Sequence, residues 1–369
     1  MEHVIRFVKK NAVMLIALAA ALLSMLLVKP DKEYLNYFDV KTLCCLFGTL
    51  AVVCALKNIH FFAILARRIM MLTGDTRTAA IVLIYITFIG SMIIANDMAL
   101  ITFLPLGYYV FSTTGRTKDV AIVFILQNIA ANLGGMLTPF GNPQNLYLYA
   151  RYNIPTGEFM GIMLFPFIVS IVLVTACCFL IEKQSLRIHE HTKEKLPRYR
   201  TLLYLALFAL TILMVFRLLQ PLYVIAIVVA VLLAVDYKAL LRVDFGLLFT
   251  FVFFFVFAGN MGRIPAVRQF FSGLMEGSTL LTAVFSCQVI SNVPSAILLS
   301  QFTDNYASLL VGVNIGGAGT LIASLASLIT FREFSAHYKK NVKEYMLWFT
   351  LLNFGFLLIL TLLALLQGR

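Results

Sequence analysis

Long apolar segments alternate with short polar or basic ones along almost the whole chain. A transmembrane helix needs roughly 17 to 25 predominantly apolar residues, and seven uninterrupted segments approach or reach this length. The pattern predicts that each of them crosses a membrane once. They are residues 11–28, 40–56, 159–181, 201–218, 221–235, 245–259 and 345–367.

Four further apolar segments are interrupted near the middle, so we expect them to be irregular. Residues 78–111 and 278–302 contain short polar sequences, Ala95-Asn96-Asp97 and Ser291-Asn292-Val293, and we interpret them as re-entrant helical hairpins. Paired glycines interrupt residues 120–152 and 307–331, which we interpret as broken transmembrane helices. The predicted fold class is an all-α polytopic membrane protein with about nine full spans and two hairpins.

Composition supports this interpretation. Of the 369 residues, 61% are hydrophobic and only 12% are charged, whereas soluble domains have about half apolar and a quarter charged residues. The formal net charge of +12 would suggest nucleic acid as the partner of a soluble protein. Here the basic residues lie between apolar segments, so we exclude nucleic acid and expect a lipid bilayer around the protein.

The distribution of basic residues predicts the orientation, because cytoplasmic loops collect Lys and Arg. We place the N-terminus in the cytoplasm and let each hairpin return to the side from which it enters. With this threading, 21 of the 29 Lys and Arg residues fall on the cytoplasmic side. They lie in the N-terminal tail with Arg6, Lys9 and Lys10, and in 57–77, 112–119, 182–200, 236–244 and 331–344. We therefore expect a multi-pass protein of a bacterial-type cytoplasmic (inner) membrane.

The two halves of the chain repeat one order of segments: a span, a basic amphipathic stretch, a hairpin, a broken helix and a span. We divide the chain into a first repeat (1–181), a basic cytoplasmic linker (182–200) and a second repeat (201–369). The corresponding elements are the stretches 57–77 and 260–277, the hairpins 78–111 and 278–302, and the broken helices 120–152 and 307–331. The hairpins enter from opposite sides, so the repeats are predicted to be inverted. Transporters with this architecture bind their ligands near the midplane.

The glycine pairs belong to a duplicated motif, Asn-x-Gly-Gly-x-x-Thr, at 132–138 and at 314–320. Paired glycines and the following prolines cannot continue a helix cheaply, and backbone without a hydrogen-bond partner is costly in lipid. Such backbone is expected to line a cavity, where carbonyl groups bind cations and helix N-termini bind anions. The alternative is that the glycines only allow close helix packing, as small residues do in membranes.

The polar residues at the hairpin turns are expected to face these breaks, and helix capping is the alternative role for them. Asp97 is an acid deep in an apolar segment, which by default suggests function. We predict that it carries a proton or binds the coupling cation, and the residues leave both choices open.

The predicted binding residues fall into two half-sites, one in each repeat. The first consists of Asn96, Asp97, Asn132, Gly134, Gly135 and Thr138, with Asn142 and Asn145 beside it. The second consists of Ser291, Asn292, Asn314, Gly316, Gly317 and Thr320. The candidate sodium sites are Asn96, Asp97 and Gly134 in the first half, and Ser291, Asn292 and Gly316 in the second. The coupling ion is expected to be Na⁺ or H⁺.

No catalytic chemistry is apparent in the sequence. It contains no nucleophile paired with a base, no phosphate-binding loop and no paired carboxylates, so we expect a protein that is not an enzyme. The six cysteines lie in apolar segments without CxxC spacing, and the histidines have no metal-ligand spacing. We therefore expect neither a cofactor nor a structural metal.

The hairpin with an Asn at its tip, followed by Asn-x-Gly-Gly-x-x-Thr-Pro-x-Gly-x-Pro-x-Asn at 132–145, resembles the ion transporter superfamily. This group includes divalent-anion/sodium symporters, citrate transporters, arsenite pumps and sodium/proton antiporters. Ala95 to Leu100 and Gly316 to Leu328 are most similar to the arsenite pump and sodium/proton antiporter branch. The tips read Ala-Asn-Asp and Ser-Asn-Val where sodium-coupled dicarboxylate carriers have Ser-Asn-Thr. The resemblance implies a scaffold, a mobile transport domain bearing both hairpins, and often a homodimer.

These observations lead to three functional hypotheses. The first is a carrier that moves a small anion or oxyanion-like solute, such as arsenite or a carboxylate, by alternating access. Its transport is coupled to Na⁺ or H⁺. The second is a cation/proton antiporter that uses Asp97. The third is a channel, which is disfavoured because hairpins and broken helices suit an alternating site better than a continuous pore.

Overall fold

The computed structural model describes residues 11–112, 117–186 and 195–369. All regular elements in these ranges are helices, as the hydrophobic pattern predicts. The first half contains α2 (Ala12–Leu27), η1 (Lys32–Tyr37), α3 (Val40–Asn58), α4 (Phe61–Met70), α5 (Thr76–Ile94), α6 (Asn96–Ser112), α7 (Thr117–Gly134), η2 (Gly135–Leu137), α8 (Pro143–Arg151) and α9 (Thr156–Cys178). The second contains α10 (Arg198–Val215), α11 (Pro221–Leu241), α12 (Phe245–Arg263), α13 (Pro265–Ile290), α14 (Asn292–Leu299), α15 (Tyr306–Ile315), α16 (Leu325–His337), η3 (Lys339–Asn341) and α17 (Val342–Leu366).

Nine helices in the described ranges are long and apolar enough to cross a membrane. The protein is therefore an all-α polytopic membrane protein. The number of long apolar helices agrees with the predicted number of spans, but the set of helices differs from the predicted set. The long first arms of both hairpins, α5 and α13, qualify, whereas α2, predicted as a full span at 11–28, has only 16 residues and does not.

The four irregular segments have the predicted interruptions. Helices α5 and α6 are separated only by Ala95, and α13 and α14 only by Ser291, so each pair forms a helical hairpin. Within α13 the backbone leaves the helical region at Ser278, where the second hairpin was predicted to begin. Helix α7 ends at Gly134 and α8 starts at Pro143, while α15 ends at Ile315 and α16 starts at Leu325. Both broken helices are thus interrupted at their glycine pairs.

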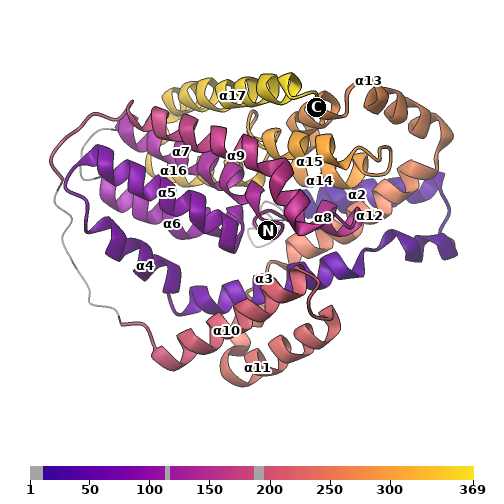
Figure 1. The fold of residues 1–369 in the computed structure, drawn as a ribbon, viewed down its shortest axis with the longest axis horizontal. Helices are drawn as coiled ribbons and strands as arrows, with labels where there is room; N and C mark the ends of the chain where they lie inside the picture. The colour runs from indigo at the N-terminus through magenta and orange to yellow at the C-terminus, as the bar shows by residue number, and fades with distance from the viewer. Residues whose placement is uncertain (1–10, 113–116, 187–194) are drawn as a thin grey trace.

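The helices are arranged so that both hairpins reach the centre of the molecule (Figure 1). Helix α7 packs against both arms of the first hairpin, and α15 packs against both arms of the second. Helices α3, α10 and α11 pack together along one side, and α12 packs mainly on α2. Helix α14 contacts both α8 and α12 near the centre. The second hairpin therefore borders elements from the first and the second half of the chain.

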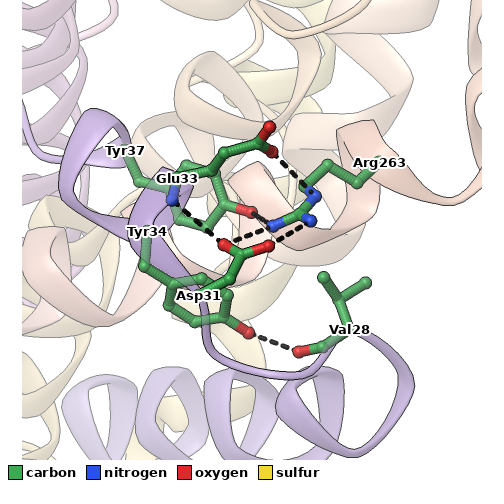
Figure 2. Close-up of polar contacts among 6 residues, drawn as sticks. All are labelled: Val28, Asp31, Glu33, Tyr34, Tyr37 and Arg263. Carbon is green, nitrogen blue, oxygen red and sulfur yellow. Dashed lines mark hydrogen bonds and ion pairs between the residues drawn. The ribbon is translucent and has the colours of Figure 1, made fainter.

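Arg263, at the end of α12, forms a polar cluster with the segment that joins α2 to α3 (Figure 2). Its guanidinium donates to both carboxylate oxygens of Asp31, at 3.0 and 2.6 Å, and to the Tyr37 hydroxyl at 3.0 Å. It also pairs with Glu33 at 3.3 Å. The hydrogen bonds from Arg263 lower the pKa of Asp31. Arg263 thus links the end of α12 to the segment between α2 and α3.

Three of the predicted basic segments fall partly outside the described residues. These are the N-terminal tail with Arg6, Lys9 and Lys10, residues 113–116 of the segment 112–119, and residues 187–194 of the linker 182–200.

Candidate functional site

The two hairpin tips have the same local geometry. Ala95 and Ser291 adopt positive φ angles of 65° and 75° with extended ψ angles of 153° and 159°. The following asparagines, Asn96 and Asn292, each accept the backbone N–H of the next residue on Oδ1 at 2.9 Å. Each asparagine thus satisfies the N–H group of the residue after it, whereas Ser291, the N-cap of α14, makes no side-chain capping bond. Each tip also carries the first N–H groups of a new helix, α6 or α14.

The threonine of each glycine motif is bonded to the neighbouring hairpin. Thr138 donates to the carbonyl of Met92 at 2.8 Å, and Thr320 donates to the carbonyl of Gln288 at 3.0 Å. Met92 and Gln288 occupy the same position in their hairpins, four residues before the tip asparagine. Each break is thus attached to the first arm of its own hairpin through the same contact.

The four motif glycines make close contacts. A Cβ atom on Gly134 would collide with the carbonyl oxygen of Phe88 in α5, and one on Gly316 would lie 2.8 Å from Cys287 in α13. At Gly135 it would collide with Asn142, whereas at Gly317 its nearest neighbour would be the Nδ2 of Asn292 at 3.1 Å. The packing role is therefore real for the first glycine of each pair, because a hairpin helix lies against it.

Backbone carbonyls freed at the breaks are satisfied by two different side chains. In the first break Asn145, from α8, donates to the carbonyls of Gly135 and Met136 at 3.1 and 3.3 Å. In the second break Gln288, from the hairpin arm α13, donates to the carbonyls of Gly316 and Ala318 at 2.9 and 3.1 Å. Gln288 also accepts the N–H of Thr320 on Oε1 at 2.9 Å. The sequence motif contains Asn145 but gives no indication of Gln288.

Asn132 connects the first hairpin to the second broken helix. Its Oδ1 accepts from Asn96 at 3.2 Å and from Ser324, the N-cap of α16, at 2.7 Å. Its Nδ2 donates to Asn128 at 3.3 Å, and Asn128 in turn donates to Ser327 at 3.2 Å. All of these side chains are buried. The first half-site is therefore joined directly to residues of the second half of the chain.

Asn314 makes the reciprocal connection from the second broken helix to the first. Its Nδ2 donates to Asn145 at 2.6 Å, and its Oδ1 accepts from Asn142 at 3.3 Å. Asn142 also donates to the carbonyl of Asn132 at 3.1 Å. The two predicted half-sites thus form one continuous hydrogen-bond network instead of two separate clusters.

A cavity of about 340 Å³ lies beside this network, within the range of about 300–1,000 Å³ typical of small-molecule sites. A smaller cavity of about 70 Å³ adjoins it and shares part of its lining. Of the predicted site residues, those that line one or both cavities are Asn96, Asp97, Asn142, Ser291 and Asn292. Both hairpin tips therefore face one space.

The other predicted site residues lie behind the cavity walls. They are Asn132, Gly134, Gly135, Thr138, Asn145, Asn314, Gly316, Gly317 and Thr320, and none of them lines either cavity. Their contacts position the hairpin tips and satisfy the broken backbone. The two candidate sodium sites are accordingly split, because Gly134 and Gly316 pack against hairpin helices while their partners face the cavity.

Five helices begin at the wall of the larger cavity. They are α6 at Asn96, α8 at Pro143, α12 after Asp244, α14 at Asn292 and α16 after Ser324. Each contributes the partial positive charge of a helix N-terminus. The first N–H groups of α14 are already paired, that of Asn292 with the carbonyl of Ala323 and that of Val293 with the side chain of Asn292. Prediction from sequence identified two of these helix starts as hairpin tips but did not identify their convergence.

The acids of the cavity are Asp97 and Asp244. Asp97 is half-buried, and its Oδ1 has no hydrogen-bond partner. Asp244 lines both cavities and was missed, because it lies in a short loop where an acid is normally only a helix cap. Among the described residues that line the two cavities, none is Lys, Arg or His.

A larger hollow of about 630 Å³ lies elsewhere, between α4, α5 and α10. Its lining is almost entirely apolar, from residues such as Phe61, Ile86 and Phe208. Among the described residues that line it, Tyr85 alone has a hydroxyl group, which is bonded to Thr175 at 2.8 Å. This hollow lacks groups that would recognise a polar solute, so we place the candidate site at the hairpin tips.

The fold and this site define a polytopic membrane transporter. The citrate transporter family matches residues 4–312, and the chain belongs to that family. The match includes the first hairpin and first glycine break and ends just before Asn314. An uncharacterized transporter, MJ0456, from Methanocaldococcus jannaschii is 33% identical over 320 residues, which cover 86% of this chain and 88% of that protein. The inner membrane protein YbiR of Escherichia coli is 29% identical over 311 residues, 82% of each chain.

The protein is thus a multi-pass membrane protein similar to an inner-membrane relative, and it moves a small-molecule solute across a lipid bilayer. The resemblance to citrate transporters within the ion transporter superfamily, inferred from the Asn-x-Gly-Gly-x-x-Thr motif and the hairpin tips, is confirmed by this family match.

Proposed function

We propose that this protein is a secondary active transporter that carries a small anion or oxyanion-like solute by alternating access, coupled to Na⁺ or H⁺. The observation that carries the proposal is the convergence of five helix N-termini and both hairpin tips on one cavity. Helix N-termini favour negative charge through the aligned dipoles of the helix. Amide and hydroxyl groups of Gln144, Asn292 and Ser324 offer further contacts.

The acids of the cavity explain why such a carrier would be coupled. An anion that enters beside Asp97 and Asp244 meets like charge, and the described lining contributes no basic side chain. A proton or cation at the acids removes that repulsion. Cation binding therefore favours anion binding, and anion binding favours cation binding to the same extent. The same acids favour a second candidate, a cation/proton antiporter in which Asp97 exchanges the two ions.

Alternating access follows from the repeat architecture that we propose, with inverted repeats at 1–181 and 201–369. It is supported by the matched tip conformations of Ala95 and Ser291 and by the matched bonds of Thr138 and Thr320. In such folds the two repeats rearrange around a fixed midplane site. The distribution of Lys and Arg supports a cytoplasmic N-terminus for this arrangement.

The test is solute flux into proteoliposomes under an imposed sodium or pH gradient, with a panel of carboxylates and oxyanions including arsenite. Gradient-driven accumulation is expected for the wild type. Asp97→Asn should reduce the coupled component to background while the variant remains monodisperse in detergent. Coupling that survives in Asp97→Asn would remove this residue from the mechanism. Uncoupled electrodiffusive flux in the wild type would contradict both carrier hypotheses and favour a channel.

A further inference from the structure

Asp244 is the N-cap of α12 and lines the same cavity as the tip of the first hairpin. Its Oδ1 accepts the backbone N–H of Leu247 at 3.0 Å, which uses one of its two carboxylate oxygens. The residue lines both the larger cavity and the smaller one, and Asp97 does so as well. Two acids from distant parts of the chain therefore share one space.

A second, independent feature of this space indicates a positively charged ligand. Gln144 is 1% exposed and lines the larger cavity, yet its Oε1 has no hydrogen-bond partner. Asp97 Oδ1 also lacks a partner. A buried oxygen without a hydrogen-bond donor is destabilising. Both residues line the larger cavity, where a bound cation would offer a partner to such oxygens.

The available ligands restrict the kind of cation. Carboxylate and amide oxygens suit hard cations, whereas soft metals favour sulfur and nitrogen. The smaller cavity, of about 70 Å³, is lined by Asp97, Asp244 and Asn142 among other residues. The oxygen groups there are suited to a hard cation such as Na⁺.

We propose that Asp97 and Asp244 bind one sodium ion between them, so that the cation connects the first hairpin to the start of α12. The proposal rests on the proposed function only for the location of the site. It adds a ligand from outside the hairpins and glycine breaks, and it makes cation occupancy depend on how close α6 lies to α12. Separation of these two helices would divide the ligand set and release the ion.

The chain offers a matched control for Asp244. Asp39 caps α3 as Asp244 caps α12, and its Oδ1 accepts the N–H of Thr42 at 3.0 Å. Asp39 lines neither cavity. Asparagine is as good an N-cap as aspartate, so Asp→Asn at either position preserves the cap and removes one negative charge.

The experiment is thermal unfolding of the purified protein in detergent, with NaCl titrated against choline chloride at constant ionic strength. The wild type and Asp39→Asn are expected to gain stability with the same sodium midpoint. Asp244→Asn should raise that midpoint at least about tenfold, the effect of losing one good ligand. Asp244→Glu, which retains the charge, should recover part of the affinity. An unchanged midpoint in Asp244→Asn, an equal shift in Asp39→Asn, or no difference between sodium and choline in the wild type would overturn the proposal.

This measurement needs neither a transported solute nor a gradient. Sodium binding that depends on both acids, without coupled flux in proteoliposomes, would leave this inference standing and contradict the proposed function. If coupled flux requires Asp97 but Asp244→Asn has no effect on sodium binding, the proposed function stands and this inference is contradicted.

Discussion

The two glycine breaks share a sequence motif but satisfy their backbone differently. In the first, Asn145 belongs to the same broken helix as the carbonyls to which it donates. In the second, Gln288 reaches across from the hairpin. Backbone groups at a break within a membrane protein must form hydrogen bonds with other protein groups. The donors come from different elements in the two halves of the chain. The carbonyls of the first break are therefore satisfied from within its own broken helix, whereas those of the second need a side chain of the hairpin.

Removing these two amides should produce the largest effects. Asn145→Ala and Gln288→Ala each leave two carbonyls without their donor, at about 1–3 kcal/mol per group. Hydrogen exchange should separate the two variants. In Asn145→Ala the increase is expected within 135–151, whereas in Gln288→Ala it should include the second hairpin. Similar exchange patterns in both variants would contradict the difference between the breaks.

The second glycine of each pair should differ in its tolerance of a side chain. At Gly135 an added Cβ would collide with Asn142 and lie 2.7 Å from the carbonyl oxygen of Gly141. Such overpacking typically costs about 1–3 kcal/mol. At Gly317 the closest atom is a side-chain nitrogen of Asn292 at 3.1 Å, which can move. Thermal unfolding of Gly135→Ala and Gly317→Ala should show a clear loss only in the first, and equal losses would refute this assignment.

The smallest effect is expected at the hairpin tips, and it is stabilising. Ala95 and Ser291 have a backbone conformation that is nearly exclusive to glycine, at a cost of about 1–3 kcal/mol. Ala95→Gly should relieve this strain and raise the unfolding temperature. Ser291→Gly should gain less, because it also removes the hydrogen bond from Ser291 to the carbonyl of Ala323. A loss of stability in Ala95→Gly would show that the tip is not strained.

Local sequence features predicted much of the fold. A polar residue within an apolar segment located both hairpin turns, and the glycine pairs located both breaks to within a few residues. The helix predicted at 11–28 is observed at Ala12–Leu27, so its bounds were close, but its 16 residues make it shorter than the nine long apolar helices. Single-residue patterns also indicated Asp97, since an acid is rare within an apolar segment.

The missing parts of the site depend on tertiary packing. Asp244 has the sequence context of an ordinary helix cap, and only the packing of α12 beside α14 brings it to the cavity. Gln288 appears as one more polar residue in a hairpin arm, and its role appears only when the second break lies against it. Asn132 and Asn314 were expected in separate half-sites, but each bonds across to the opposite half of the chain.

The cluster around Arg263 (Figure 2) affects the order in which this protein can be assembled during synthesis. Asp31 and Arg263 are 232 residues apart in sequence, and Ser24 of α2 accepts from Asn260 across a similar separation. At about 5–20 residues per second, α12 is made roughly 10 to 50 s after α2. Helix α2, shorter than a full span, must therefore stay in or near the membrane without its permanent neighbour during that interval. The first helix of the described residues thus obtains its main packing partner only after most of the chain has been made.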